Sequence, residues 1–120
     1  MRKLVTFERI RRSDGTSEFD DFLDSLPVKD RAKLEAVILK TELNGLEVAK
    51  RMQWVKKLKG DIFELRSKQG SNIQRALYFQ FTGTEYVITH GFTKKTDRTP
   101  ETEINRAIAM MKSYLKGDDR

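Results

Sequence analysis

The sequence predicts an α+β domain. Three observations support this prediction: two stretches with helical periodicity near the N-terminus, three stretches with strand periodicity in the middle, and a further helical stretch near the C-terminus. A chain of 120 residues has the usual size of one domain, and no repeat or linker divides it. We therefore expect a single domain over residues 1–120.

The N-terminal part is expected to form a strand followed by a helical hairpin. Residues 3–7 are rich in β-branched and aromatic side chains, which favour a strand. Apolar residues then recur at helical spacing over 19–26, behind hydroxyl side chains that can cap the first turn. Pro27 ends this helix, and a second helix is expected over 29–43, with Gly45 as its left-handed stop.

The apolar period changes to two in the middle of the chain. Strands are predicted over 62–66, 73–81 and 86–92, and the short turns between them indicate an antiparallel three-stranded meander. The N-terminal strand should join this meander, whose apolar face should pack on the helices. A terminal helix follows, with the Thr99 hydroxyl as its expected N-cap.

The composition excludes several protein classes. The chain has no cysteine, so disulfide scaffolds, thiolate zinc sites and thiol nucleophiles are excluded. Its one histidine, His90, has no Gly-x-Ser-x-Gly partner motif, and neither a phosphate-binding glycine loop nor a His-Glu-x-x-His motif occurs. Apolar runs are far shorter than the roughly 20 residues of a membrane helix. We expect a cytoplasmic protein that uses no membrane, metal ion or cofactor.

The positive charge is concentrated in one segment. The chain has 24 lysine and arginine residues against 18 acidic ones, a net charge of +6. Residues 50–98 contain 11 of these basic residues and only 4 acidic ones, so the remainder of the chain is nearly balanced. This distribution is typical of a basic face on an otherwise balanced domain, and it favours a polyanion or an acidic protein as partner.

Four short segments lie in a fixed order on and beside the predicted strands. They are Lys57-Leu58-Lys59-Gly60, Ile62-Phe63-Glu64-Leu65-Arg66, Arg75-Ala76-Leu77-Tyr78 and His90-Gly91-Phe92-Thr93-Lys94-Lys95. In this order, and with the terminal helix, they resemble the RelE/ParE superfamily of toxins from bacterial type II toxin–antitoxin systems, above all its phage-associated HigB-like branch. The resemblance covers the order of elements along nearly the whole chain and is strongest over 54–111.

The resemblance has implications for fold, activity and partners. It implies a RelE-like fold and a ribosome-dependent endoribonuclease that cleaves mRNA without a metal ion and so inhibits translation. It also implies a cognate antitoxin, expected to contain a helix-turn-helix, that holds the toxin inactive.

The residues are compatible with this chemistry. Metal-free RNA cleavage needs a base for the 2′-hydroxyl, donors for the charge that grows on the phosphorane, and an acid for the departing 5′-oxygen. Arg66 and Arg75, on neighbouring strands, carry planar guanidinium groups that match two phosphate oxygens, so we expect them to stabilise this charge. Lys94 and Lys95 are candidates for proton transfer, with only one facing the site because successive strand residues point to opposite faces.

His90 is a further candidate for proton transfer, because its unperturbed pKa near 6.5 suits that role. A structural role at the end of a strand is the alternative interpretation. RelE-type relatives place a tyrosine shortly after the last strand, whereas residues 93–104 contain none, so the general acid is unassigned.

Lysines before the meander and an arginine after it are expected to bind RNA. Lys56, Lys57, Lys59 and Arg98 should contact the RNA backbone or ribosomal RNA. The alternative for any such residue is an ordinary solvated surface. Trp54 is either a base-stacking platform or an anchor that packs its loop onto the sheet, and we favour packing.

Two other functions stay open at this stage. One is a ParE-like inhibitor of DNA gyrase, and the other is a non-catalytic nucleic-acid-binding protein. ParE-type proteins lack a basic catalytic cluster, so the charge of residues 50–98 favours the endoribonuclease. A binding module would instead show salt-dependent binding without cleavage.

Overall fold

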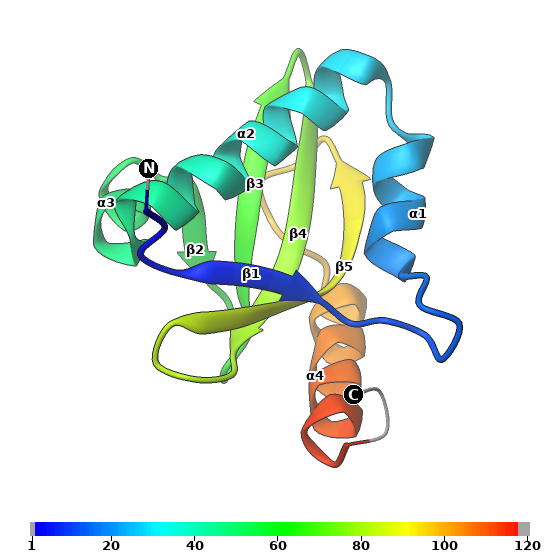
Figure 1. The fold of residues 1–120 in the computed structure, drawn as a ribbon. Helices are drawn as coiled ribbons and strands as arrows, with labels where there is room; N and C mark the ends of the chain where they lie inside the picture. Colours follow the sequence, from blue (N-terminus) through cyan, green and yellow to red (C-terminus); the bar gives the residue numbers. More distant parts are fainter. Residues whose placement is uncertain (1, 118–120) are drawn as a thin grey trace.

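Residues 2–117 are described by the computed structural model, and within them the chain forms a five-stranded mixed sheet and four helices (Figure 1). The strands are β1 (Thr6–Arg9), β2 (Val55–Lys57), β3 (Phe63–Gln69), β4 (Asn72–Gln80) and β5 (Glu85–Lys94). The helices are α1 (Glu18–Ser25), α2 (Val28–Asn44), α3 (Leu46–Arg51) and α4 (Glu101–Leu115). The predicted α+β class is confirmed.

The strands lie in the order β1-β5-β4-β3-β2. Consecutive strands from β2 to β5 pair antiparallel, whereas β1 runs parallel to the first half of β5. A bulge in the β4–β5 pairing lies at Leu77/Tyr78, where His90 opposes Leu77 and Ile88 opposes Tyr78. The sheet therefore ends at β1 on one side and at the short strand β2 on the other.

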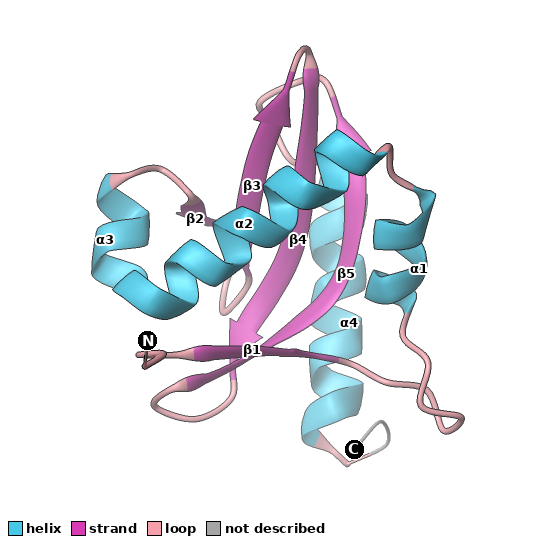
Figure 2. Cartoon of the chain, turned by 45° about the horizontal axis from the view of Figure 1, so that its top comes forward, coloured by secondary structure: helices cyan, strands magenta, loops and turns pink. Residues whose placement is uncertain are grey.

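Helices cover both faces of the sheet (Figure 2). On one face, α1 and α2 pack on a core that includes the Tyr78 ring. On the other face, α4 packs through Ala107 and Met111 on Leu77 and Phe92. Within residues 2–117, each helix falls short of the length and hydrophobicity that a membrane crossing requires.

The antiparallel part of the sheet has four strands, not the expected three. The prediction missed β2 because three residues, two of them lysines, are too short to show a strand period. It also missed α3, a helix of six residues. The first strand lies at Thr6–Arg9, not at 3–7, because the backbone N–H groups of Leu4 and Val5 donate to the Glu42 carbonyl at the end of α2.

The predicted helix caps were right at α1 and wrong at α4. The Ser17 hydroxyl accepts a hydrogen bond from the Asp20 N–H at 2.9 Å, and Gly45 has the left-handed φ of 88° that ends α2. At α4 no side chain caps the helix, and the Thr99 hydroxyl donates instead to Glu64 Oε1 at 2.7 Å. Because the Thr99 hydroxyl binds the buried Glu64 carboxylate, it does not cap α4 as the sequence pattern predicted.

Gly91 of β5 is a position at which the packing requires a glycine. A Cβ there would collide with the ring of Phe22 on α1 and lie 3.1 Å from the backbone oxygen of Arg75. We expect Gly91→Ala to lower the free energy of unfolding by about 1–3 kcal/mol, because neither the ring nor the strand can move freely. Urea denaturation measures this change.

Gly83→Ala is the matched control, since a Cβ at Gly83 meets no atom within 4 Å. Equal denaturation midpoints for the two variants would contradict the expected contact between β5 and α1.

Candidate functional site

Five of the predicted site residues share the sheet face that α4 covers. Residues directly opposite each other in antiparallel strands point to the same face. The register pairs Arg66 with Arg75 and Arg75 with Phe92, and Phe92 belongs to the core beneath α4. By the same register, this face also carries Lys56 opposite Glu64, His90 opposite Leu77, and Lys94 opposite Ile73.

A buried carboxylate lies between the two guanidinium groups. Glu64 is fully buried, and its Oε2 lies 3.3 Å from Arg66 Nε while its Oε1 lies 4.0 Å from Arg75 Nε. The Thr99 hydroxyl donates to the same Oε1. One carboxylate on β3 thus joins two cations from neighbouring strands to the segment before α4.

The loop between β5 and α4, residues 95–100, closes over this cluster. The Arg75 guanidinium donates to the Thr96 carbonyl and, at 3.2 Å, to the Thr99 hydroxyl. Arg66 Nη2 donates to the Asp97 carbonyl at 2.8 Å, and its Nη1 lies 3.6 Å from the Asp97 carboxylate. The two arginines therefore hold the loop, which accepts three hydrogen bonds from their guanidinium groups.

The two arginines differ in their access to solvent. The Arg75 side chain is 0% exposed, and burial lowers the pKa of Arg75 below its usual value, against the opposing effect of Glu64. The Arg66 side chain is 19% exposed and lines a hollow of about 170 Å³ with Lys68 and Asp97. Arg66 is therefore the member of the pair that can meet a ligand without movement of the loop.

A second hollow, of about 390 Å³, lies between β2 and the start of α4. Three of the predicted RNA-binding residues line it, namely Lys56, Lys59 and Arg98. Lys59 Nζ forms an exposed ion pair with Glu101 at 2.9 Å. The fourth, Lys57, faces the opposite side of the sheet, because it follows Lys56 along β2.

The lysines at the end of β5 are exposed. Lys94 lies opposite Ile73 on the face of Arg66, whereas Lys95 follows the last residue of the strand. The register places Lys94 on that face, and it does not extend to Lys95.

His90 is enclosed beneath α4. Its ring is 1% exposed, with Nε2 3.0 Å from Glu103 Oε1 and Nδ1 3.1 Å from the Thr89 hydroxyl. Burial lowers the pKa of His90, and the hydrogen bond to Glu103 opposes this shift. The ring is therefore neutral near pH 7, and it joins β5 to α4.

Three residues of this cluster were not predicted from the sequence to belong to the site: Glu64, Asp97 and Thr99. The spacing of Glu64 and Arg66, two apart in one strand, does place them on the same face, but alternation alone does not show that the face is buried.

Trp54 packs against the core beneath α2, which agrees with the favoured packing role. Among residues 2–117, no group of three or more histidine or acidic side chains is arranged to hold a metal ion.

The sheet face that carries Lys56, Arg66, Arg75 and Lys94, called the cationic face below, belongs to a small basic α+β protein. Residues 21–112 match the family model described as "Phage derived protein Gp49-like (DUF891)", and the chain belongs to this family. It is 31% identical over 103 residues to the "Probable endoribonuclease HigB1" of two Mycobacterium tuberculosis strains, covering 86% of this chain and 78% of the relative. The resemblance to HigB-like toxins of toxin–antitoxin systems is thereby confirmed.

We expect Glu64→Gln to lower the free energy of unfolding by about 3–5 kcal/mol. The substitution leaves the buried Arg75 cation without its carboxylate partner, and an uncompensated buried charge costs about that much. Thermal and urea denaturation measure the loss.

Glu101→Gln is the control, because it removes a carboxylate from the exposed ion pair with Lys59, which is worth about 0–1 kcal/mol. Similar stabilities for the two variants would show that Glu64 is not the partner that holds Arg75.

We expect the stability of the chain to decrease as the pH falls below about 6.5. The pKa of His90 is lowered in the folded state, so the unfolded chain binds a proton more readily and protonation favours unfolding. The stabilisation is fully present above that pH and is lost toward the lowered pKa. His90→Gln cannot be protonated and should flatten the dependence between pH 7 and pH 5, as measured by urea denaturation. If the free energy of unfolding of the parent and of His90→Gln changes equally with pH, protonation of His90 is not the cause.

Proposed function

We propose that the protein is the toxin of a type II toxin–antitoxin system and that it cleaves mRNA on the ribosome, which inhibits translation. Membership of the Gp49-like family and the 31% identity to the probable endoribonuclease HigB1 support endoribonuclease activity. The family also implies an antitoxin as partner. We further propose that cleavage proceeds by attack of the 2′-hydroxyl without a metal ion.

The observation that carries the proposal is the in-register pair of Arg66 and Arg75 on the cationic face. A phosphorane formed at the hollow beside Arg66 would gain charge-assisted hydrogen bonds from its guanidinium group. We assign Arg75 as a positioning residue, because it is buried and holds the loop through Thr96 and Thr99. For the same reason Arg66, not Arg75, is the informative residue to replace.

Cleavage requires a base and an acid near this hollow. In the proposed step, Lys94 takes the proton of the 2′-hydroxyl, and the 2′-oxygen forms a bond to phosphorus. The bond from phosphorus to the 5′-oxygen then breaks, and this oxygen takes a proton from solvent water. The products are a 2′,3′-cyclic phosphate and a 5′-hydroxyl. We assign His90 as a positioning residue for α4, because its ring is enclosed against Glu103.

The cations around the second hollow would position the RNA. Lys56, Lys59 and Arg98 surround it from β2, the β2–β3 turn and the β5–α4 loop. Contacts of this kind go to phosphates and carry little sequence information, but they make binding salt-dependent.

The experiment uses the purified chain with free mRNA and with mRNA on translating ribosomes, and it maps the new 5′ ends. Cleavage only in the presence of ribosomes, with 5′-hydroxyl and 2′,3′-cyclic phosphate ends, is the expected result. Ends with a 5′-phosphate would contradict the proposed attack by the 2′-hydroxyl. Intact mRNA with loss of DNA supercoiling would favour a gyrase inhibitor, and salt-dependent RNA binding without cleavage would favour a binding module.

We expect Arg66→Ala to reduce the rate of mRNA cleavage by about 10²–10³-fold, the usual cost of removing one donor from a developing oxyanion. Arg51→Ala is the matched control, because Arg51 is an exposed arginine on α3, away from the cationic face. Cleavage rates and circular dichroism spectra are compared for both variants. Arg66 has no part in the reaction if both variants cleave like the parent protein.

A further inference from the structure

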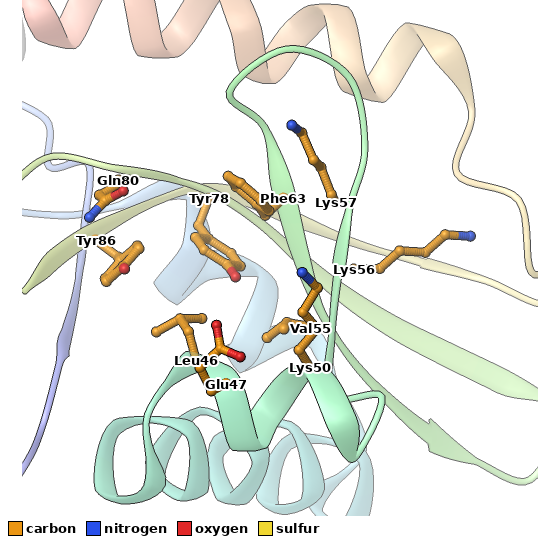
Figure 3. A pocket seen from close by; sticks show the side chains of 10 residues that line it. All are labelled: Leu46, Glu47, Lys50, Val55, Lys56, Lys57, Phe63, Tyr78, Gln80 and Tyr86. Carbon is orange, nitrogen blue, oxygen red and sulfur yellow. The ribbon is translucent and has the colours of Figure 1, made fainter.

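An apolar groove lies on the sheet face opposite Arg66, between α3 and strands β2 to β4 (Figure 3). Its volume is about 400 Å³, within the usual range of ligand pockets. Its apolar wall is formed by Leu46, Val55, Phe63, Tyr78 and Tyr86. None of these residues has a role in the proposed cleavage reaction.

The Tyr78 hydroxyl is a polar group at the base of this groove. The residue is 1% exposed, and Figure 3 shows its hydroxyl pointing into the groove. Burial raises the pKa of Tyr78, so the hydroxyl keeps its proton and can donate. A ligand oxygen at this point would accept that hydrogen bond, a contact worth about 0.5–1.5 kcal/mol.

The rim of the groove is positively charged. The Lys50 and Lys57 ammonium groups lie at the rim with one carboxylate, Glu47, whereas the Lys56 side chain extends to the other face of the sheet. Neither Lys50 nor Lys57 forms an ion pair with a carboxylate in the part of the chain that the structure describes, so their charges are available to a partner. The charge at the rim is therefore complementary to an acidic partner.

The geometry favours a protein side chain over a nucleobase. The Phe63 and Tyr78 rings stack on each other with centroids 5.6 Å apart, and the Phe7 ring contacts Tyr78 edge-on at 5.0 Å. Tyr78 therefore presents no open ring face on which a base could stack.

We propose that this groove is a docking site for an acidic segment of the antitoxin, which inserts one large apolar side chain between α3 and the sheet. A backbone carbonyl of that segment accepts the hydrogen bond of the Tyr78 hydroxyl, and its carboxylates pair with the lysines of the rim. The proposal rests on the proposed function for the identity of the partner. The groove and Arg66 lie on opposite faces, so docking and RNA cleavage can be measured separately.

The test measures the dissociation constant of the toxin for the antitoxin encoded beside it, by isothermal titration calorimetry. We expect Leu46→Asp to weaken binding by at least about 30-fold, because a charge would enter the pocket of the apolar anchor. Lys57→Glu, at an exposed position, should weaken binding and reduce its salt dependence. Tyr78→Phe should weaken binding by about 5–10-fold through loss of one hydrogen bond.

Leu39→Asp is the matched control, because Leu39 is an exposed leucine on α2 that does not line the groove. Parent-like affinity of both Leu46→Asp and Lys57→Glu would overturn the proposal. So would variants that lose affinity for a single-stranded RNA oligonucleotide while the antitoxin still binds normally. Ribosomal mRNA cleavage by Leu46→Asp should match that of the parent. If neither the parent nor Leu46→Asp cleaves mRNA, but the affinities for the antitoxin change as expected, only the proposed function fails.

Discussion

The buried Glu64 carboxylate is the interaction on which the arrangement of this domain depends. It lies beneath the loop between β5 and α4, where two guanidinium groups and one hydroxyl surround it. A carboxylate in such a place is tolerated only when it is paired and hydrogen-bonded, so its partners are constrained in turn. Arg75 must remain buried beside it, and Thr99 must leave the end of α4. The path of the chain from β5 to α4 follows from these contacts.

The two faces of the sheet are suited to different ligands. The face beneath α4 presents cations around small polar hollows, which suit phosphate groups. The face beneath α3 presents an apolar groove with a charged rim, which suits a peptide. Lys56 and Lys57 are neighbours in β2, yet they point to different faces because side chains alternate along a strand. One short edge strand thus contributes to both surfaces.

The loop of residues 95–100 covers part of the cationic face. Its carbonyl groups at Thr96 and Asp97 accept hydrogen bonds from the two arginines, as phosphate oxygens would. The carboxylate of Asp97 lies near Arg66 and is largely exposed, so this contact is weak and easily replaced. The Arg75 contacts are buried and are therefore retained. The site accordingly has one accessible guanidinium group, that of Arg66, and one that is buried, that of Arg75.

The sequence by itself determined the α+β class, the approximate helices and main strands, and the placement of Arg66 and Arg75 on neighbouring strands, because periodicity and turn residues are local properties. Alternation along β5 also indicated that one of Lys94 and Lys95 faces the site. Only the tertiary structure decided which charges are buried. The enclosure of Arg75 and His90, the pairing with Glu64 and the groove beneath α3 arise where segments distant in the chain meet, and desolvation at such contacts has no signature in local sequence.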